Sequence, residues 1–465
     1  MLFLLVLLAL AFLFQYVLVL FLIFLLQLVF LFRGVLALLS LFSLCACGGR
    51  KTVTVRYLNF KPEVAEKYEA ISKEYEKQTG VRVVIDTAAA NTYEQTLLSR
   101  LPTSDAPTIF QINGPRSFSS FKDYLSDMKG TELYKHLSDP SLALAKDGMV
   151  YGVPYVVEGY GIIYNKRLME RYFALEGKQT PYKSVDEIKS LDALSAVARD
   201  MQKNKDALGI EGVFAATSLK SGEDWRWQTH LLNLPLSFEM EEKNADIATS
   251  DYKDFEFKYS EGFQKLFDLY LENSTVPKNA LGTKTVADSM AEFALEKCAM
   301  VQNGSWAYAQ ISSEKGNKVK AEDVGFLPLY IGAEGEESQG ICIGTENYYA
   351  INKKASAEER EAAQNFLWWL YSSESGKRFV REELGFIAPF DTFSEGDVPN
   401  DPLAKEVLRF MQSDTQKNVP WRFSAIPSLR LKEDFGASLL AYAQGKKSFA
   451  AVISDLKASW KNESK

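Results

Sequence analysis

A regular alternation of strand-like and helix-like segments after residue 50 constrains the fold most strongly. β-Branched residues alternate along the strand-like segments, and apolar residues recur at helical spacing between them. The first helix-like segment ends at Gly80, a residue typical of helix C-termini. These segments are strands over 51–60, 81–89 and 107–114 and helices over 62–80 and 92–104. This order predicts an α/β fold with a mostly parallel sheet flanked by helices.

The same pattern restarts later in the chain, without a long linker or a short repeat. We expect strands over 213–218, 297–306, 323–330 and 340–352, and helices over 260–273 and 356–385. A Ser356–Glu359 pair forms a capping box at the start of the last helix. The sequence therefore predicts two closely associated α/β lobes.

The N-terminal segment is a separate case, because Met1 to Phe32 carries no charge and is long enough to span a bilayer. Arg33 and an apolar stretch follow, and Leu44-Cys45-Ala46-Cys47-Gly48 resembles a bacterial lipobox. The resemblance implies a leader over 1–46, cleavage before Cys47 and lipidation of its sulfur. A plain transmembrane anchor is the alternative. Residues 1–30 suit neither and suggest a start codon placed too far upstream.

Charge and cysteine content exclude some function classes. The net charge of −7 argues against a nucleic-acid-binding protein, which needs a basic face. Beyond Cys45 and Cys47, the chain holds only Cys298 and Cys342, whose pairing in an oxidising compartment depends on geometry.

Motifs for catalysis, metal binding and cofactor binding are absent from the sequence. There is no HExxH, CxxC, GxSxG or Walker-type glycine loop. The only two histidines, His136 and His230, each stand alone on a helix-like segment and are interpreted as structural. We therefore expect a binding protein without metal or cofactor. A glycan hydrolase or lyase with paired carboxylates is the alternative.

The most informative stretch is YGVPYVVEGYGIIYNK, residues 151–166, in which Glu158 lies within an apolar strand-like run. A buried carboxylate needs a partner, either in the protein or in a ligand. Turn-rich segments elsewhere place Trp225, Trp306 and Trp421 where α/β proteins bind ligands. Aromatic rings pack on the flat face of a sugar, and a carboxylate accepts its hydroxyls.

Five segments in register resemble the bacterial extracellular solute-binding proteins of family 1, which deliver sugars to ABC importers. They begin KTVTVRYLNF, APTIFQING, GMVYGVPYVVEGYGIIYNK, FALEKCAMVQNGSW and EAAQNFLWWLYSSESGKRF, and the similarity covers nearly all of 51–465. It implies lobe 1 over 51–157 and 340–388, lobe 2 over 161–333 and 393–465, and hinges near 157–161, 333–340 and 388–393.

The resemblance also implies site residues. The family's glutamate in the YG-VP…EG block binds sugar hydroxyls, a role that falls on Glu158, and the tryptophan of the NG-W turn matches Trp306. The remaining candidates are Asn59, Lys61, Asn113, Arg116, Tyr155, Trp225, Glu346 and Trp421. Thr108 replaces the family's usual aspartate.

Structural roles remain open for three of these residues. Glu158 could pair with Arg116 or Lys166, Trp306 could pack between the lobes, and Arg116 could be a solvated charge.

The expected function is a monomeric, lipid-anchored protein on the outer face of the bacterial cell membrane. It would close its lobes around a carbohydrate and dock on the ABC importer permease. The glycan-acting enzyme and a lipoprotein scaffold without a small ligand are the alternatives.

Overall fold

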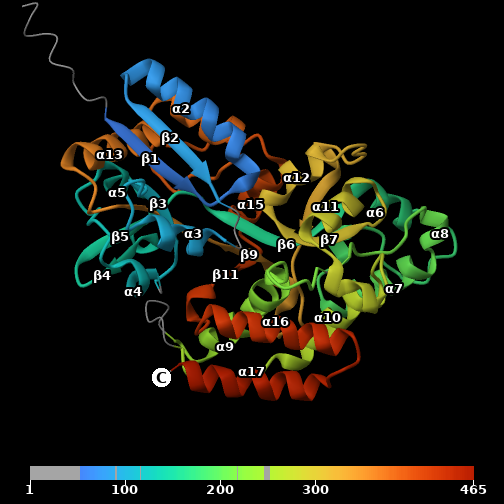
Figure 1. Ribbon diagram of the computed structural model, residues 1–465. Helices are drawn as coiled ribbons and strands as arrows, with labels where there is room; N and C mark the ends of the chain where they lie inside the picture. Colours follow the sequence, from blue (N-terminus) through green and yellow to red (C-terminus); the bar gives the residue numbers. More distant parts are fainter. Residues whose placement is uncertain (1–52, 89–91, 116, 217, 246–251, 465) are drawn as a thin grey trace, which may run out of the picture. The chain divides into compact units, whose positions relative to one another are not determined.

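Two β-sheets, each with its own helices, organise the part of the chain that follows the N-terminal segment (Figure 1). The computed structural model describes residues 53–88, 92–115, 117–216, 218–245 and 252–464. The predicted leader and Cys47 therefore lie outside the described residues.

The first sheet has six strands in the order β2-β1-β3-β10-β5-β4. Their bounds are β1 Thr54–Asn59, β2 Arg82–Thr87, β3 Ile109–Asn113, β4 Leu144–Lys146, β5 Met149–Pro154 and β10 Asn347–Ile351. Helix α2 (Ala65–Thr79) joins β1 to β2 and buries Tyr68, Ile71 and Tyr75 against the sheet. It ends at Gly80, whose φ of 73° is left-handed, as the sequence predicts.

Other helices of this first lobe are short or come from late in the chain. They are η1 Pro62–Val64, α3 Tyr93–Arg100, α4 Ser117–Phe121, α5 Glu132–Lys135, η2 Pro140–Leu142, α13 Ala357–Ser372, α14 Glu374–Arg378 and the π-helical turn η9 Phe379–Glu383. The capping box predicted at Ser356 and Glu359 is present at the start of α13.

The second sheet has the order β11-β9-β6-β7, and β8 also pairs with β6. Its strands are β6 Glu158–Asn165, β7 Met300–Gly304, β8 Val324–Leu327, β9 Gln339–Gly344 and β11 Lys417–Pro420. Helices and turns of this second lobe are α6 Lys166–Phe173, η3 Val185–Glu187, α7 Leu191–Lys203, α8 Lys205–Leu208, η4 Arg226–Leu231, α9 Asn233–Glu242, α10 Ser260–Glu272, η5 Lys278–Thr283, α11 Val286–Ala294, η6 Ser305–Ala307, α12 Tyr308–Ser313, η7 Ala321–Asp323, η8 Glu336–Ser338, α15 Pro402–Met411, η10 Phe423–Ala425, α16 Leu429–Ala443 and α17 Phe449–Glu463.

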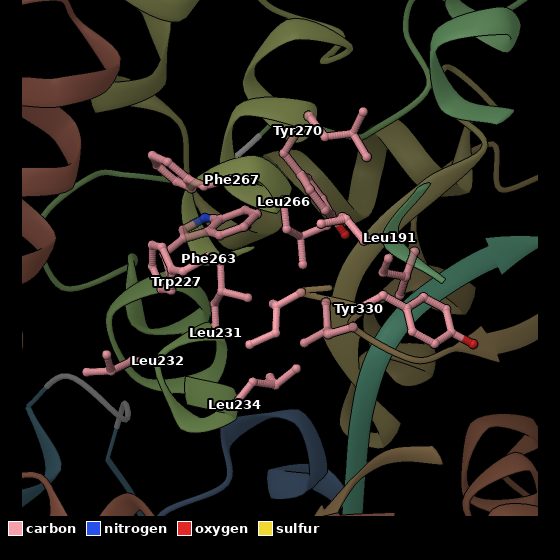
Figure 2. Close-up of a cluster of buried hydrophobic side chains, with 14 of the residues drawn as sticks. Leu191, Trp227, Leu231, Leu232, Leu234, Phe263, Leu266, Phe267, Tyr270 and Tyr330 are labelled. Atoms are coloured by element: carbon pink, nitrogen blue, oxygen red, sulfur yellow. The ribbon is translucent and has the colours of Figure 1, made fainter. Parts of the chain in front are cut away.

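The two lobes have separate apolar cores. Figure 2 shows part of the second core, where Trp227 from η4 lies among the side chains of Leu231, Phe263 and Phe267. Trp227 is only 1% exposed. The first core packs α2 and α13 on the sheet through residues such as Tyr68 and Phe366.

The prediction that both sheets are mostly parallel is wrong. Only β1–β2, β1–β3 and β9–β11 are parallel, and the other described ladders are antiparallel. The reason is the route of the chain. Strands β6 and β10 each arrive from the other sheet, so they enter at the edge where their neighbours end and run in the opposite direction.

The chain changes sheet at points that differ from the predicted hinges. The first change lies at 155–157, between β5 and β6, so Gly159 and Gly161 already belong to β6. The second is the two-residue link Thr345–Glu346 between β9 and β10. The predicted hinge at 333–340, and with it the placement of 340–344 in lobe 1, is wrong because β9 pairs with β6.

The third point at which the chain passes from one lobe to the other lies after Phe393. Phe390 and Phe393 still pack on Tyr371 in the first core, whereas Leu403 of α15 lies in the second lobe. The predicted hinge at 388–393 is therefore too early in the chain.

In the predicted strand over 213–218, the described residues 213–216 and 218 do not form a strand. Phe214 makes isolated bridges to Ser274 and Met300, and no ladder extends from it within the described residues. The segment fills the space beside β7 with buried apolar side chains, which explains its strand-like composition.

Cys298 and Cys342 are free, buried thiols. They lie in different apolar clusters, because Cys298 packs beside Phe293 and Cys342 lies in β9 near Tyr160. The structure thus settles the question left open by the sequence against a disulfide.

We expect a reductant to leave the melting temperature of the purified protein unchanged. A disulfide between these residues would contribute about 2–4 kcal/mol, so its reduction would lower the melting temperature by several degrees. Thermal unfolding with and without dithiothreitol measures the difference. A drop of several degrees that disappears in Cys298→Ser would contradict the structure.

Candidate functional site

The ends of strands from both sheets meet at one place, next to the links between the sheets. In the first sheet, the end of β3 at Asn113 faces the start of β10 at Asn347. In the second sheet, the start of β6 at Glu158 faces the end of β9 at Gly344. Ligands of α/β proteins bind at such strand ends, so this is the candidate site.

Glu158 pairs with Lys61, which follows β1 in the first lobe. Its Oε1 lies 2.8 Å from Lys61 Nζ, and both residues are almost fully buried. Asn59 holds the Lys61 backbone, because its Nδ2 donates to Lys61 O at 2.8 Å and its Oδ1 accepts from Lys61 N at 3.1 Å. A lysine from one lobe thus meets a glutamate at the base of the other, rather than the partners Arg116 or Lys166 considered from the sequence.

Two further carboxylates surround this ion pair. Lys61 Nζ also lies 3.6 Å from Glu63 Oε1. Burial opposes the charge of Lys61, but Glu158 and Glu63 outweigh it and raise the pKa of Lys61. Burial also raises the pKa of Glu63 and of Glu346, shifts that Lys61 partly offsets. The site is therefore a compact group of charges shielded from water.

Trp306 and Trp421 lie over two glycines at strand ends. A Cβ at Gly304 would lie 2.2 Å from the Trp306 ring, and a Cβ at Gly344 would lie 2.6 Å from the Trp421 ring. Both positions therefore require glycine for steric reasons. Asn233 fixes the Trp421 segment, because it donates to Pro420 O and accepts from Arg422 N.

Trp225 immediately precedes the π-helical turn η4, and His230 lies within it. In such a turn, residues five apart face the same side, and the two rings meet at 4.9 Å. Trp227 points to the opposite side, into the core. The π-helical turn thus separates a half-buried tryptophan of the candidate site from a core tryptophan two residues away.

Trp225, Trp306, Trp421 and His230 form one aromatic cluster with Tyr160 and Phe423. The three tryptophans are half-buried. His230 stacks on Tyr160 at 4.2 Å and on Phe423 at 5.3 Å. Trp306 lies 6.0 Å from Trp225 and 6.5 Å from Trp421. The Lys61 ammonium lies 5.9 Å from the Trp306 ring centre, which connects the cluster to the ion pair.

Several buried polar atoms around this place have no hydrogen-bond partner among the described residues. Because an unpaired buried donor or acceptor costs about 1–3 kcal/mol, such atoms mark positions for a ligand or water. They are Gln111 Nε2, His230 Nδ1, Thr345 Oγ1, Asn347 Oδ1 and Trp421 Nε1.

A cavity of about 30 Å³ lies beside the ion pair. Glu63, Glu158, Ser305, Trp306, Phe386 and Asp401 are among the residues that line it. It is far smaller than a ligand pocket, which has roughly 300 Å³ or more. This cavity reaches Trp306 but not Trp225, His230 or Trp421, and a ligand can enter it only if the side chains that line it move.

The structure brings together Lys61, Glu158, Trp225, Trp306 and Trp421 of the predicted residues, and Glu346 lies in the adjacent link. Of the other three described candidates, Asn59 and Asn113 lie at strand ends beside this group, and Tyr155 lies in the first core.

Tyr155 stacks on Tyr349 in the first core, Asn59 uses its amide within the protein, and Asn113 is exposed at the end of β3. Arg116 lies outside the described residues.

Sequence reasoning missed Tyr160, Phe423 and Glu63, and it interpreted His230 as a structural histidine. The structure places His230 at the centre of the cluster with Nδ1 unpaired. Burial lowers the pKa of His230 well below its usual range, so the ring is neutral. The five-residue spacing of Trp225 and His230 is the one signal that could have indicated this role.

The described residues contain no group of three or more His, Cys, Asp and Glu side chains placed to hold a metal ion. None of their helices combines the length and the apolar character that crossing a membrane requires.

Residues 70–406 match the family described as bacterial extracellular solute-binding protein. The chain belongs to this family. A curated relative, the multiple sugar-binding protein of Streptococcus mutans, is 22% identical over 395 residues, which cover 81% of this chain and 85% of the relative. Membership implies a place outside the cytoplasm for this solute-binding protein, and its relatives are binding proteins rather than enzymes.

Solved structures agree on the two-lobe fold. RafE in complex with raffinose has a TM-score of 0.67 at 18% identity, over 89% of this chain and all of the other. Maltose-bound MalE3 of T. maritima has a TM-score of 0.65 at 17% identity, over 88% of this chain and 99% of the other. At such low identity these likenesses establish the fold.

We expect Gly304→Ala and Gly344→Ala to displace Trp306 and Trp421 and to destabilise the protein by about 1–3 kcal/mol, as overpacking does. Urea unfolding and the tryptophan emission spectrum of the folded protein measure both effects. Gly130→Ala is the control, because no atom lies within 4 Å of its added Cβ. Equal behaviour of all three variants would show that the glycines have no steric role.

Lys61→Met should cost about 3–5 kcal/mol, because it leaves the Glu158 carboxylate buried without its partner. Adding Glu158→Gln should recover part of this loss, since the remaining charge is then removed. Urea denaturation of the single and double variants measures the coupling.

Lys73→Met is the matched control, because Lys73 and Glu69 form an exposed pair worth less than about 1 kcal/mol. No recovery in the double variant would mean that Lys61 and Glu158 are not energetically coupled.

Proposed function

We propose that this protein captures a sugar between its lobes and delivers it to an ABC importer. The observation that carries the proposal is the combination of half-buried tryptophans with a buried carboxylate and unpaired polar atoms at the strand ends of both lobes. Stacking faces surrounded by hydrogen-bonding groups match the two-sided chemistry of a pyranose.

Each lobe contributes a different part of the recognition. The second lobe supplies Trp225, Trp306 and Trp421, on which the flat C–H face of a sugar ring packs. The first lobe supplies Lys61 and polar groups at the ends of β3 and β10, such as Gln111 and Asn347, for hydroxyls. Glu158 accepts hydroxyl hydrogens with the oxygen that Lys61 leaves free.

Binding is coupled to lobe movement in this proposal. The strand ends of the two lobes are in contact through the Lys61–Glu158 ion pair, so the lobes open, take up the ligand and close again. The links at 155–157 and 345–346 are where the backbone would bend. Because both lobes contact the sugar, it binds the closed form better and shifts the population toward it.

The relatives support a sugar as the solute. They include a multiple sugar-binding protein, RafE in complex with raffinose and maltose-bound MalE3. A chitin oligosaccharide binding protein is a further structural neighbour, with a TM-score of 0.66 at 17% identity.

Delivery completes the proposal. A lipid on Cys47 would anchor the monomer at the outer face of the membrane and raise its effective concentration at the permease. The lipobox-like sequence around Cys47 supports this anchor.

Sugar binding is tested with the full-length protein in a detergent without a sugar head group. We expect one of a panel of maltose-, raffinose-, xylose- and chitin-type sugars to shift the tryptophan emission and raise the melting temperature. At a concentration of about 100 times Kd, the gain is about 2.7 kcal/mol. Trp306→Ala should weaken binding about ten- to a hundredfold, because it removes the central stacking surface.

Trp368→Ala is the control, since Trp368 stacks on His136 in the first lobe, outside the aromatic cluster. Equal weakening in both variants would argue against the site. Consumption of a glycan, detected as released reducing ends, would favour the hydrolase instead.

A further inference from the structure

The stacking surface of the site is built around one side chain. Trp225, Trp306 and Trp421 lie 4.9, 5.6 and 6.4 Å from the His230 ring. We call these four rings the ring cup. All of its tryptophans therefore lie around a single imidazole rather than along the length of a groove.

The tilt of the rings supports the same conclusion. Trp306 stands at 51° to Trp225 and at 81° to Trp421. A long oligosaccharide that stacks ring after ring needs separate aromatic platforms along its path. Steeply inclined rings in contact around one centre instead offer one compact face, on which a single sugar ring can stack.

One end of the ring cup is closed by the protein. The Lys61 ammonium lies 5.9 Å from both Trp306 and Phe386, and its ion pair with Glu158 fills the space toward the links between the lobes. A sugar chain cannot continue in this direction without displacing a buried salt bridge, which is costly.

Aromatic rings on the opposite lobe do not extend the surface. The partly buried Phe60 and Phe118 near the strand ends pack toward the first core, Phe60 at 5.2 Å from Tyr93 and Phe118 at 4.9 Å from Tyr151. The described residues thus provide one compact stacking surface, on the second lobe.

We infer that the ligand is a short sugar, a mono- or disaccharide, or the end of a longer chain, with one ring stacked in the ring cup. A second ring contacts the polar strand ends of the first lobe, and a third ring lies beyond aromatic contact. This inference rests on the proposed function and adds the size of the ligand to it.

The test is the dependence of affinity on chain length, measured by titration calorimetry on the full-length wild-type protein, so that no variant needs to fold. The probes are glucose to maltohexaose, xylose to xylohexaose, the chito-oligosaccharides from one to six rings, and galactose, melibiose, raffinose and stachyose.

In the series that binds, we expect affinity to increase up to two rings and then to change by less than about twofold for each added ring. Each further ring stacked on an aromatic side chain would instead tighten binding about two- to tenfold. A continued increase of that size through four or more rings would overturn the inference while leaving sugar binding intact. If no series binds, the proposed function fails, and the inference fails with it.

His230→Ala provides a second readout. Removing the central ring should weaken the monosaccharide and the trisaccharide by the same factor, because both use the same cup. A larger loss for the trisaccharide would indicate that the aromatic surface extends along the chain and would contradict the inference.

Discussion

The buried ion pair between Lys61 and Glu158 is the interaction on which the site depends. It joins the end of the first strand of one sheet to the first residue of the strand that enters the other. Two charges can stay buried only when they are paired, so this pair holds the strand ends of the two lobes in contact. The aromatic cluster, the unpaired polar atoms and the links between the sheets all lie around it.

The backbone rather than the side chains makes room for the tryptophans. Gly304 and Gly344 end two strands of the second sheet, and without a Cβ they let the indoles of Trp306 and Trp421 fold back over the strand ends. The π-helical turn adds Trp225 and His230 from another direction. Three unrelated chain segments therefore build one surface, which explains why a compact cup rather than a row of rings results.

Much of the fold was predictable because it follows from local periodicity. The early strand–helix alternation, the end of α2 at Gly80 and the capping box of α13 depend on neighbouring residues alone. Errors arose where pairing is non-local. The segment 340–352 is a continuous strand-like run in sequence, yet its halves belong to different sheets, and strand direction depends on the route of the chain between lobes.

The sequence by itself determined that two α/β lobes form, and that Glu158, Trp225, Trp306 and Trp421 were candidates for one site, because residue type and local context carry that information. Only the tertiary structure decided that Lys61 is the partner of Glu158, that His230 lies at the centre of the tryptophans, and that Tyr155 belongs to the core. Partners 97 residues apart, such as Lys61 and Glu158, are chosen by packing in three dimensions, which no local pattern encodes.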